Sequence, residues 1–257
     1  MMNIRQIINF QGNYSRINRE ERNLSAIFFL ALCNSKNAER FLKHFGYSTK
    51  IGPDFGIYFE YAFLRDLWNK VNSNQVKKEI IRQHLKIRNI DKILNQPIVD
   101  INRFFGVAGT PSKDYLQYPG RWAITKYHAH FPDNDDFIKI CRFKWSFNIK
   151  PDIVVHLDKN FAICIEAKFE SGEGHYPGSS GDKQIFNKRQ LTYIGQMELQ
   201  KYMMEELLGI NTDFILLVNK KERSKTHKIV SWKEMFRCLD LGDLPLFAQE
   251  MVRSVSD

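Results

Sequence analysis

The sequence has no long hydrophobic run, no internal repeat and no closely spaced pair of cysteines. Its longest apolar run, Ala26 to Cys33, is eight residues long and therefore too short to span a bilayer. The first residues contain no sustained apolar stretch before a small-residue cleavage site, so we expect neither a secretory signal nor a membrane partner. The four cysteines form no Cys-x-x-Cys pair, which argues against zinc ribbons and redox motifs. Their apolar neighbours predict buried free thiols in a reducing cytoplasm.

What the sequence does have is a globular composition and an excess of positive charge. Its 43% hydrophobic and 26% charged residues are typical of folded proteins, and 257 residues suffice for one large domain or two small ones. The 38 Lys and Arg residues against 29 Asp and Glu give a net charge of +9. This excess favours a polyanionic partner, although a composition rich in Lys, Asn and Ile can be basic without any functional cause.

Hydrophobic spacing predicts helices in the first part of the chain. The expected helices begin near Arg19 and cover Asn37 to Phe45, Ile57 to Val71 and Gln75 to Arg88. The stretch from about 90 to 132 is interrupted by Pro and Gly, and we interpret it as part of a helical insertion with loops. The Lys and Arg residues of the fourth helix are interpreted as a solvated face, with phosphate contacts as the alternative.

Strand patterns begin at Asp136. Apolar and polar residues alternate from Cys141 to Phe147, and turn-forming residues join two further apolar segments, Pro151 to Leu157 and Phe161 to Phe169. A loop over 171–182, a helix from about Arg189 to Leu208, a strand from Asp213 to Asn219 and a helix from Trp232 to Leu239 follow. The sequence therefore predicts a single α/β domain over 1–257, with core elements at about 19–46 and 136–240 and a helical insertion at about 51–132.

Asp152 and Glu166 are expected to face each other across a hairpin. The predicted turn centres near Lys159, and the two acids are equidistant from it. Opposite side chains of an antiparallel pair have Cβ atoms about 4.5–5.5 Å apart. Two carboxylates at that distance repel, and in a dry site one of them would stay protonated. A hard divalent cation removes the conflict, and Mg²⁺ binds one or two carboxylates while keeping several waters.

Lys168 lies two residues after Glu166 and therefore projects from the same face of the strand. A carboxylate pair beside an ammonium group suits phosphodiester hydrolysis, in which the metal polarises the phosphate and activates water while the lysine orients water or offsets developing charge. The alternative is a turn aspartate and an exposed Glu–Lys ion pair. The apolar neighbours on both faces of the strand favour the first interpretation, because charges within a covered sheet are costly unless paired or bound to metal.

Pro151-Asp152, thirteen further residues and Glu166-Ala167-Lys168 resemble the signature of the PD-(D/E)XK nuclease superfamily. The resemblance implies a restriction-endonuclease-like core of helix, three strands, helix and strand, with a mixed central sheet flanked by helices. That order agrees with the order of elements predicted above. The resemblance also implies that Asp152 and Glu166 bind metal with the Ala167 carbonyl as a further ligand, and that Lys168 is catalytic. Mg²⁺ is the implied cofactor, with Mn²⁺ as a substitute.

Many members of the superfamily add an acidic residue from the first helix. Glu20 and Glu21 are both candidates here, since both lie where the predicted helix begins. Glu20 projects nearer the centre of the buried face, whereas Glu21 better fits an acid placed shortly before an apolar run of small residues, and we choose Glu21. The alternative is that these acids only complement the helix dipole.

Gln196 and Gln200 lie one turn apart on one face of the helix after the lysine strand. Some families carry Gln-x-x-x-Tyr there, and this chain lacks the tyrosine. We expect the glutamines to hold substrate or the active-site strand, with ordinary surface positions as the alternative. Phosphate contacts are further expected from the basic residues after the fourth strand, with a solvated loop as the alternative: Lys220, Lys221, Arg223, Lys225 and Lys228.

The resemblance implies a metal-dependent DNA endonuclease of restriction or phage-defence type that acts on double-stranded DNA. Two alternatives stay open: an inactive nucleic-acid-binding or assembly module on the same fold, and an RNA-cleaving nuclease. A homodimer would suit a double-strand cutter, because one active site addresses one strand. Partner proteins of a defence system would supply any ATPase activity, because the chain has no Walker-type phosphate-binding string.

Overall fold

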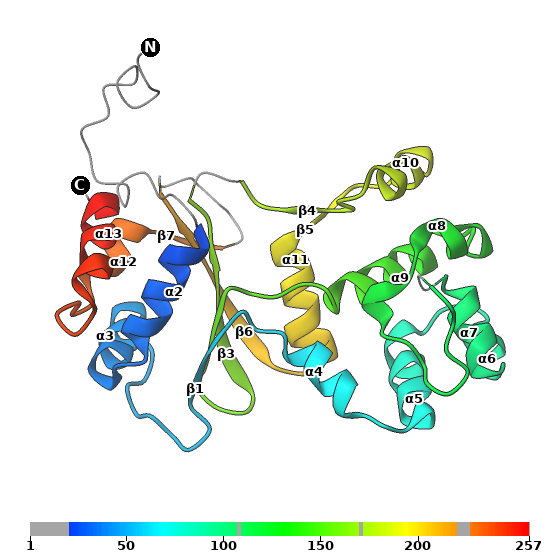
Figure 1. Cartoon of the computed structure of the whole chain (residues 1–257), viewed down its shortest axis with the longest axis horizontal. Helices are drawn as coiled ribbons and strands as arrows, with labels where there is room; N and C mark the ends of the chain where they lie inside the picture. The colour runs from blue at the N-terminus through cyan, green and yellow to red at the C-terminus, as the bar shows by residue number, and fades with distance from the viewer. Residues whose placement is uncertain (1–20, 107–108, 170–171, 220–226, 257) are drawn as a thin grey trace, which may run out of the picture.

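A five-stranded mixed sheet forms the centre of the molecule (Figure 1). The computed structural model describes residues 21–106, 109–169, 172–219 and 227–256. In sheet order the strands are β1 (Gly56–Phe59), β2 (Ile153–His156), β3 (Phe161–Ala167), β6 (Asn211–Val218) and β7 (Lys228–Ser231). β1, β2 and β3 are antiparallel neighbours, whereas β3, β6 and β7 run parallel. None of the described helices combines the length and apolar character that a membrane span requires.

Four helices cover one face of the sheet, on the left in Figure 1. They are α2 (Glu21–Leu32), α3 (Ser35–Phe45), α12 (Trp232–Arg237) and α13 (Leu246–Ser256). Phe28 of α2 lies at the centre of their core, where its ring packs edge-on against Phe41, Trp232 and Phe236. Asn34 caps the start of α3, and Gly46 ends it in the left-handed conformation with φ 79°. The helix expected from Asn37 to Phe45 is therefore confirmed.

The opposite face is covered by α11 and by a helical layer. The helices of this layer are α4 (Phe63–Lys70), α5 (Asn74–Leu85), α6 (Ile90–Leu94), α7 (Ile98–Phe104), α8 (Ile124–Tyr127) and α9 (Asn134–Ser146). α11 (Gln196–Lys201) continues directly into the π-helical turn η4 (Tyr202–Leu207). Between β3 and α11 the chain forms a small antiparallel pair, β4 (His175–Tyr176) and β5 (Ile194–Gly195), with α10 (Ser180–Lys188) between its strands.

The hairpin of β2 and β3 has the predicted register. Ile153 pairs with Ile165 and His156 pairs with Ala162, so the pairing centres on Lys159 as expected. Asp158 closes the turn. Its Oδ1 accepts hydrogen bonds from the main-chain N–H groups of Asn160, at 2.7 Å, and Phe161, at 2.9 Å. This Asx-type turn fixes the register that the site depends on.

The strand expected from Cys141 to Phe147 is wrong, because these residues belong to α9. The helix lies between the sheet and the outer helices, so Phe143 is buried although it lies on the side of the helix opposite the buried Cys141 and Trp145. Burial on several sides removes the single apolar stripe that identifies a helix and leaves an accidental alternation. The first strand of the sheet is instead β1, which lies within the segment assigned to the insertion.

The single helix expected from Ile57 to Val71 is also wrong, since β1 occupies its first part and α4 its second. Glu60 separates the two elements with φ 51°, a conformation that ends regular structure. The expected loop over 171–182 contains β4 and the start of α10, and the helix expected from about Arg189 begins at Gln196. The observed core order is still α2, then β1, β2 and β3, then α11 and β6.

The cysteines are free but not uniformly buried. Cys141 and Cys164 are buried as expected, whereas Cys33 is exposed and Cys238 is partly exposed. The expectation of four buried thiols is therefore only half right. Arg19 and Glu20, which were expected to open the first helix, lie outside the described residues.

Candidate active site

Asp152 and Glu166 meet where β2 begins and β3 ends. The register of the hairpin, continued by one residue, places them opposite each other. Asp152 Oδ2 accepts a hydrogen bond of 2.8 Å from the main-chain N–H of Ala167. The side chain of Glu166 is only 1% exposed and that of Asp152 is half-buried. The two predicted acids are thus brought together at the end of a central strand.

Pro151 cannot donate a strand hydrogen bond to the main-chain carbonyl that lies beside these acids. Continued by two residues beyond the printed pairs, the register places Pro151 opposite Ala167, and the Pro151 carbonyl accepts a hydrogen bond of 3.0 Å from the N–H of Tyr61 on the β1 side. Proline has no N–H, so the Ala167 carbonyl receives no hydrogen bond from β2. The Ala167 N–H and carbonyl point to the same side of the strand, and the N–H is bonded to Asp152. The carbonyl oxygen therefore faces the side on which Asp152 lies.

Lys168 connects the acids to the first helix. Its Nζ lies 2.6 Å from Glu166 Oε1 and 3.4 Å from Glu21 Oε1. Glu21 is the first residue of α2, and its other oxygen accepts a hydrogen bond of 3.2 Å from the main-chain N–H of Phe169. Glu21 thus contacts the end of β3 from the face of the sheet that α2 covers, which is the face opposite α11. Glu20 lies outside the described residues, so the structure places only Glu21 at the site.

Both predicted glutamines contact Glu166 from α11. The Nε2 group of Gln196 donates to Glu166 Oε1, and that of Gln200 donates to Glu166 Oε2 at 2.5 Å. With the bond from Lys168, the buried carboxylate accepts three side-chain hydrogen bonds. Gln200 is completely buried, so the alternative of an ordinary surface position does not hold for it. The one-turn spacing of the glutamines places one amide on each oxygen of Glu166.

The two acids hold protons more tightly than isolated carboxyl groups do. Burial, reinforced by the neighbouring charge of Asp152, raises the pKa of Glu166 to about 7. Burial likewise raises the pKa of Asp152 to about 6 against the opposing effect of the Ala167 N–H. Burial would lower the pKa of Lys168, but the surrounding carboxylates, Glu166 first, outweigh it and raise that pKa. The lysine therefore stays charged, while the raised pKa values of the two acids indicate that one ammonium group does not offset the cost of burying both carboxylates in charged form.

This arrangement fits a hard divalent cation. Asp152 Oδ1 accepts no hydrogen bond from the described part of the chain, and the Ala167 carbonyl lies on the same side of β3. No group of three or more His, Cys, Asp or Glu side chains with metal-binding geometry exists among the described residues. Mg²⁺ does not need such a group, because it takes one or two carboxylates and completes its octahedron with water. The all-oxygen donors of Asp152, Glu166 and Ala167 match that preference.

Two residues that contact the site were not expected from the sequence. Trp232 Nε1 donates a hydrogen bond of 3.1 Å to the main-chain carbonyl of Lys168. Glu173, shortly after β3, accepts a hydrogen bond of 3.0 Å from the main-chain N–H of Met197 in α11. The only sequence signal for Glu173 is its position between two glycines directly after the lysine strand.

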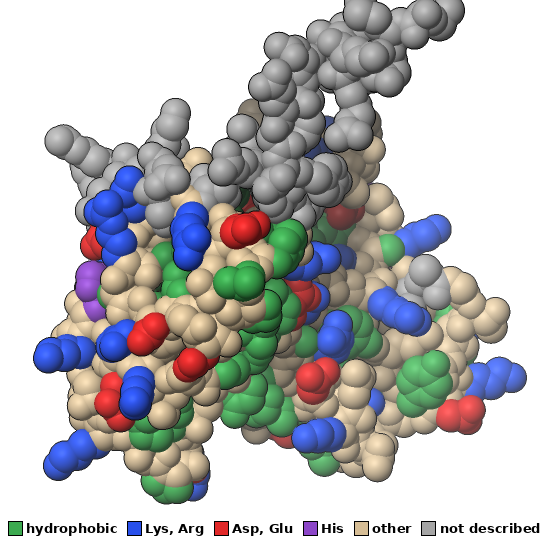
Figure 2. Space-filling model, turned by 60° about the vertical axis from the view of Figure 1, so that its left-hand side comes forward, with side chains coloured by type: hydrophobic (Ala, Val, Ile, Leu, Met, Phe, Trp, Pro, Cys, Tyr) green, Lys and Arg blue, Asp and Glu red, His purple; other side chains and the backbone are tan. Residues whose placement is uncertain are grey.

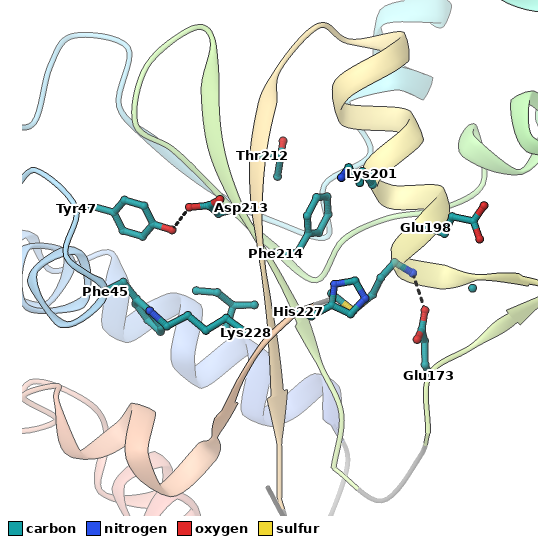
Figure 3. A pocket seen from close by; sticks show the side chains of 13 residues that line it. Phe45, Tyr47, Glu173, Glu198, Lys201, Thr212, Asp213, Phe214, His227 and Lys228 are labelled. Atoms are coloured by element: carbon teal, nitrogen blue, oxygen red, sulfur yellow. Dashed lines mark hydrogen bonds between the residues drawn. The ribbon is translucent and has the colours of Figure 1, made fainter. Parts of the chain in front are cut away.

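A cleft of about 870 Å³ is lined in part by Glu173 and by the start of α11 (Figure 3). Figure 3 shows Glu173 on one side of it and the hydrogen-bonded pair of Tyr47 and Asp213 on the other. Neither Asp152, Glu166 nor Lys168 lines it. Among the basic residues expected to contact phosphates, Lys228 lines the cleft with its ammonium group 4.3 Å from the ring centre of Phe45. The other four, at 220, 221, 223 and 225, lie outside the described residues.

Basic side chains do not form one continuous patch on the face drawn in Figure 2. Lys and Arg are intermixed there with Asp and Glu, and a band of apolar side chains runs down the middle of the view. Along the sequence the charges are better separated: residues 56–150 contain 16 Lys and Arg against 9 Asp and Glu, whereas residues 151–219 contain 6 against 10. The strands that carry the site are thus acidic, and the helical segment between β1 and β2 is basic.

Comparison with protein-family models, with curated proteins and with solved structures finds no match to this chain in any of the three.

Proposed function

We propose that this chain is a Mg²⁺-dependent nuclease of the PD-(D/E)XK type that hydrolyses phosphodiester bonds in double-stranded DNA. The observation that carries the proposal is the buried carboxylate of Glu166, which faces Asp152 across the hairpin and lies 2.6 Å from Lys168 Nζ. The order of α2, three strands, α11 and β6 supports a restriction-endonuclease-like core. A restriction or phage-defence enzyme is the biological setting that we propose for this activity.

Each site residue has its own role in the proposed hydrolysis. Asp152, Glu166 and the Ala167 carbonyl would hold Mg²⁺, with Mn²⁺ as a substitute, and the bound ion would supply a polarised phosphate and a more acidic water. Lys168 stays protonated, so its role is to offset the negative charge that develops on the phosphate and to orient water, rather than to remove a proton. Glu21 keeps the ammonium group beside the site, and the two glutamines hold the Glu166 carboxylate in one orientation.

The distribution of charge supports a nucleic-acid substrate. A metal needs local negative charge, which the strands supply, whereas a phosphate backbone needs basic groups at a distance from the metal. Residues 56–150 carry that excess of Lys and Arg. A duplex whose backbone contacts this helical segment would bind in a strongly salt-dependent manner.

The decisive experiment incubates the protein with supercoiled plasmid DNA and Mg²⁺. Asp152→Asn, Glu166→Gln and Lys168→Ala are each expected to slow cleavage at least about 100-fold, because each removes a metal ligand or the charge that stabilises the transition state. Lys159→Ala is the matched control: it removes an exposed lysine from the turn of the same hairpin and should leave the rate unchanged.

Cleavage that persists in both Asp152→Asn and Lys168→Ala would contradict the assignment. Faster cleavage of an RNA matched in sequence would redirect it to an RNA nuclease. Tight, salt-sensitive binding without any cleavage under Mg²⁺ or Mn²⁺ would instead indicate an inactive binding module.

A further inference from the structure

The start of α11 is held by the short segment that follows the lysine strand. We name residues 173–176 the strap. Gly195 precedes α11 and has no side chain with which to cap it. The N–H of Met197 donates instead to Glu173 Oε1 at 3.0 Å, the bond marked by the dashed line at Glu173 in Figure 3. The N–H of Gln196 donates to the Gly174 carbonyl at 2.8 Å. Two N–H groups that lack partners within the helix are therefore bonded by the strap.

Glycines at two positions leave room for this contact. A Cβ atom on Gly174 would lie 2.6 Å from Gln196 Oε1, and one on Gly195 would lie 2.6 Å from Glu173 Oε1. Cβ atoms essentially never approach other atoms this closely, so a side chain at either position would displace the end of the Gln196 or Glu173 side chain. The two glycines thus let the Gln196 amide and the Glu173 carboxylate lie directly against the main chain. The amide oxygen of Gln196 faces the strap, and its Nε2 group faces Glu166.

These contacts form a continuous path from Glu173 to the catalytic carboxylate. Glu173 bonds Met197, the neighbouring Gln196 is bonded to the strap, and the Gln196 amide donates to Glu166. A carboxylate at a helix N-terminus is also favoured by the helix dipole. No other described side chain is bonded to the Met197 N–H, so this path depends on the Glu173 carboxylate.

We propose that Glu173 is a positioning residue for the nuclease site: by capping α11 it holds the Gln196 amide against Glu166. The catalytic consequence of this inference rests on the proposed function, whereas the structural part does not. Residues that orient a metal ligand commonly change metal affinity 10–100-fold when they are removed. Loss of Glu173 should therefore weaken metal binding although Glu173 itself holds no metal.

The first test observes Gln196 directly in the metal-free protein. Its side-chain amide signal is identified in an ¹⁵N spectrum by its disappearance in Gln196→Ala. Glu173→Ala is expected to shift that signal to the position of a freely rotating amide. Glu173→Gln is expected to preserve it, because its amide oxygen can accept the same hydrogen bond. The matched control is Glu198→Ala, which removes an exposed acid from the first turn of the same helix. An unchanged signal in Glu173→Ala would overturn the proposal.

The second test measures Mn²⁺ affinity by the electron paramagnetic resonance of the free ion. Glu173→Ala should raise the dissociation constant about tenfold in the wild-type background and less than about twofold in the Gln196→Ala background. Glu173→Gln should restore most of the affinity. Equal losses in both backgrounds would mean that Glu173 acts independently of Gln196, which contradicts the positioning role.

The two tests separate this proposal from the proposed function. If the wild-type protein binds no Mn²⁺ that depends on Asp152, the nuclease assignment fails, and the spectrum of Gln196 alone decides the positioning role. If Mn²⁺ binds and DNA is cleaved but the Gln196 signal does not respond to Glu173→Ala, the positioning role fails while the nuclease assignment stands.

Discussion

The indole Nε1 of Trp232 donates a hydrogen bond of 3.1 Å to the main-chain carbonyl of Lys168. Trp232 is fully buried, with its ring stacked on Phe236 and edge-on to Phe28. The bond joins the start of α12 to the residue that follows β3. The backbone that carries Lys168 is therefore supported from the face of the sheet opposite α11.

Trp232→Phe should lower the free energy of unfolding by about 1–3 kcal/mol, because the Lys168 carbonyl loses its buried donor. Guanidinium denaturation measures this change. The companion variant Phe236→Leu removes apolar volume from the same cluster but keeps the hydrogen bond. Under conditions in which both variants are fully folded, we expect Trp232→Phe to slow DNA cleavage and Phe236→Leu to leave the cleavage rate unchanged. Equal rates in the two variants would show that the bond has no influence on Lys168.

Glu166→Gln should stabilise the metal-free protein at alkaline pH. The pKa of Glu166 rises from an ordinary value of 4.5 to about 7, so between these values the folded protein holds a proton that the unfolded chain has released. The free energy of unfolding of the wild type therefore falls as pH rises through this window. A glutamine has no charge to bury, so at pH 8 we expect a melting temperature higher by about 2–6 °C.

The same variant should also have a flatter dependence of melting temperature on pH between 5 and 8. Glu206→Gln, which neutralises an exposed acid of the π-helical turn η4, provides the control and should follow the wild type. A wild-type melting temperature that increases from pH 5 to pH 8 in the presence of a chelator would contradict the direction of the shift.

Protons and metal should compete for the carboxylate pair. The pKa values of Asp152 and Glu166 are raised to about 6 and about 7, so a cation must displace protons at acid pH. We expect the affinity for Mn²⁺ to increase at least about tenfold between pH 6 and pH 8, as measured by calorimetry in buffers of different ionisation enthalpy. Binding that is independent of pH, or that releases no proton at pH 6, would place the metal elsewhere.

Glu21 should matter through its charge as well as its hydrogen bond. Glu21→Gln keeps an acceptor for the N–H of Phe169 but removes the carboxylate that lies 3.4 Å from Lys168 Nζ. We expect the glutamine variant to slow cleavage about tenfold and the alanine variant Glu21→Ala to slow it further. Glu39→Gln, in the neighbouring helix α3, is the control acid. If both Glu21 variants cleave at the wild-type rate, Glu21 only complements the helix dipole.

The hairpin of β2 and β3 could be predicted from the sequence because its signals are local. The turn residues Asp158 to Asn160 and the apolar segments on both sides define a register, and that register alone places Asp152 opposite Glu166. The helix spacing of Gln196 and Gln200 was likewise sufficient to place both amides on one face. The hairpin register and the helix spacing together place most of the predicted site residues: Asp152, Glu166, Gln196 and Gln200.

The elements that were mispredicted depend on distant parts of the chain. α9 is covered on several sides, so the residues from Cys141 to Phe147 carry no helical stripe; its start is marked only by Asp133, whose side chain caps it. β1 has only four residues, and its aromatic side chains resemble the beginning of a helix. Its partner β2 follows only after the whole helical segment, so no local signal identifies the strand. The contact of Trp232 with the site could not be predicted for the same reason, because its hydrogen bond joins residues 64 positions apart.

The pairing of β1 with β2 also determines when the site can form during synthesis. Phe59 pairs with Ile153, so the sheet cannot gain its edge strand until the entire helical segment between them has been made. Closing so long a loop costs more conformational entropy than closing the tight hairpin of β2 and β3, although the cost grows only with the logarithm of loop length. Helices α4 to α9 shorten that loop by folding within it. On the ribosome, Glu21 and β1 therefore precede the hairpin and α11, and the residues of the candidate site are not all present until Gln200 has been translated.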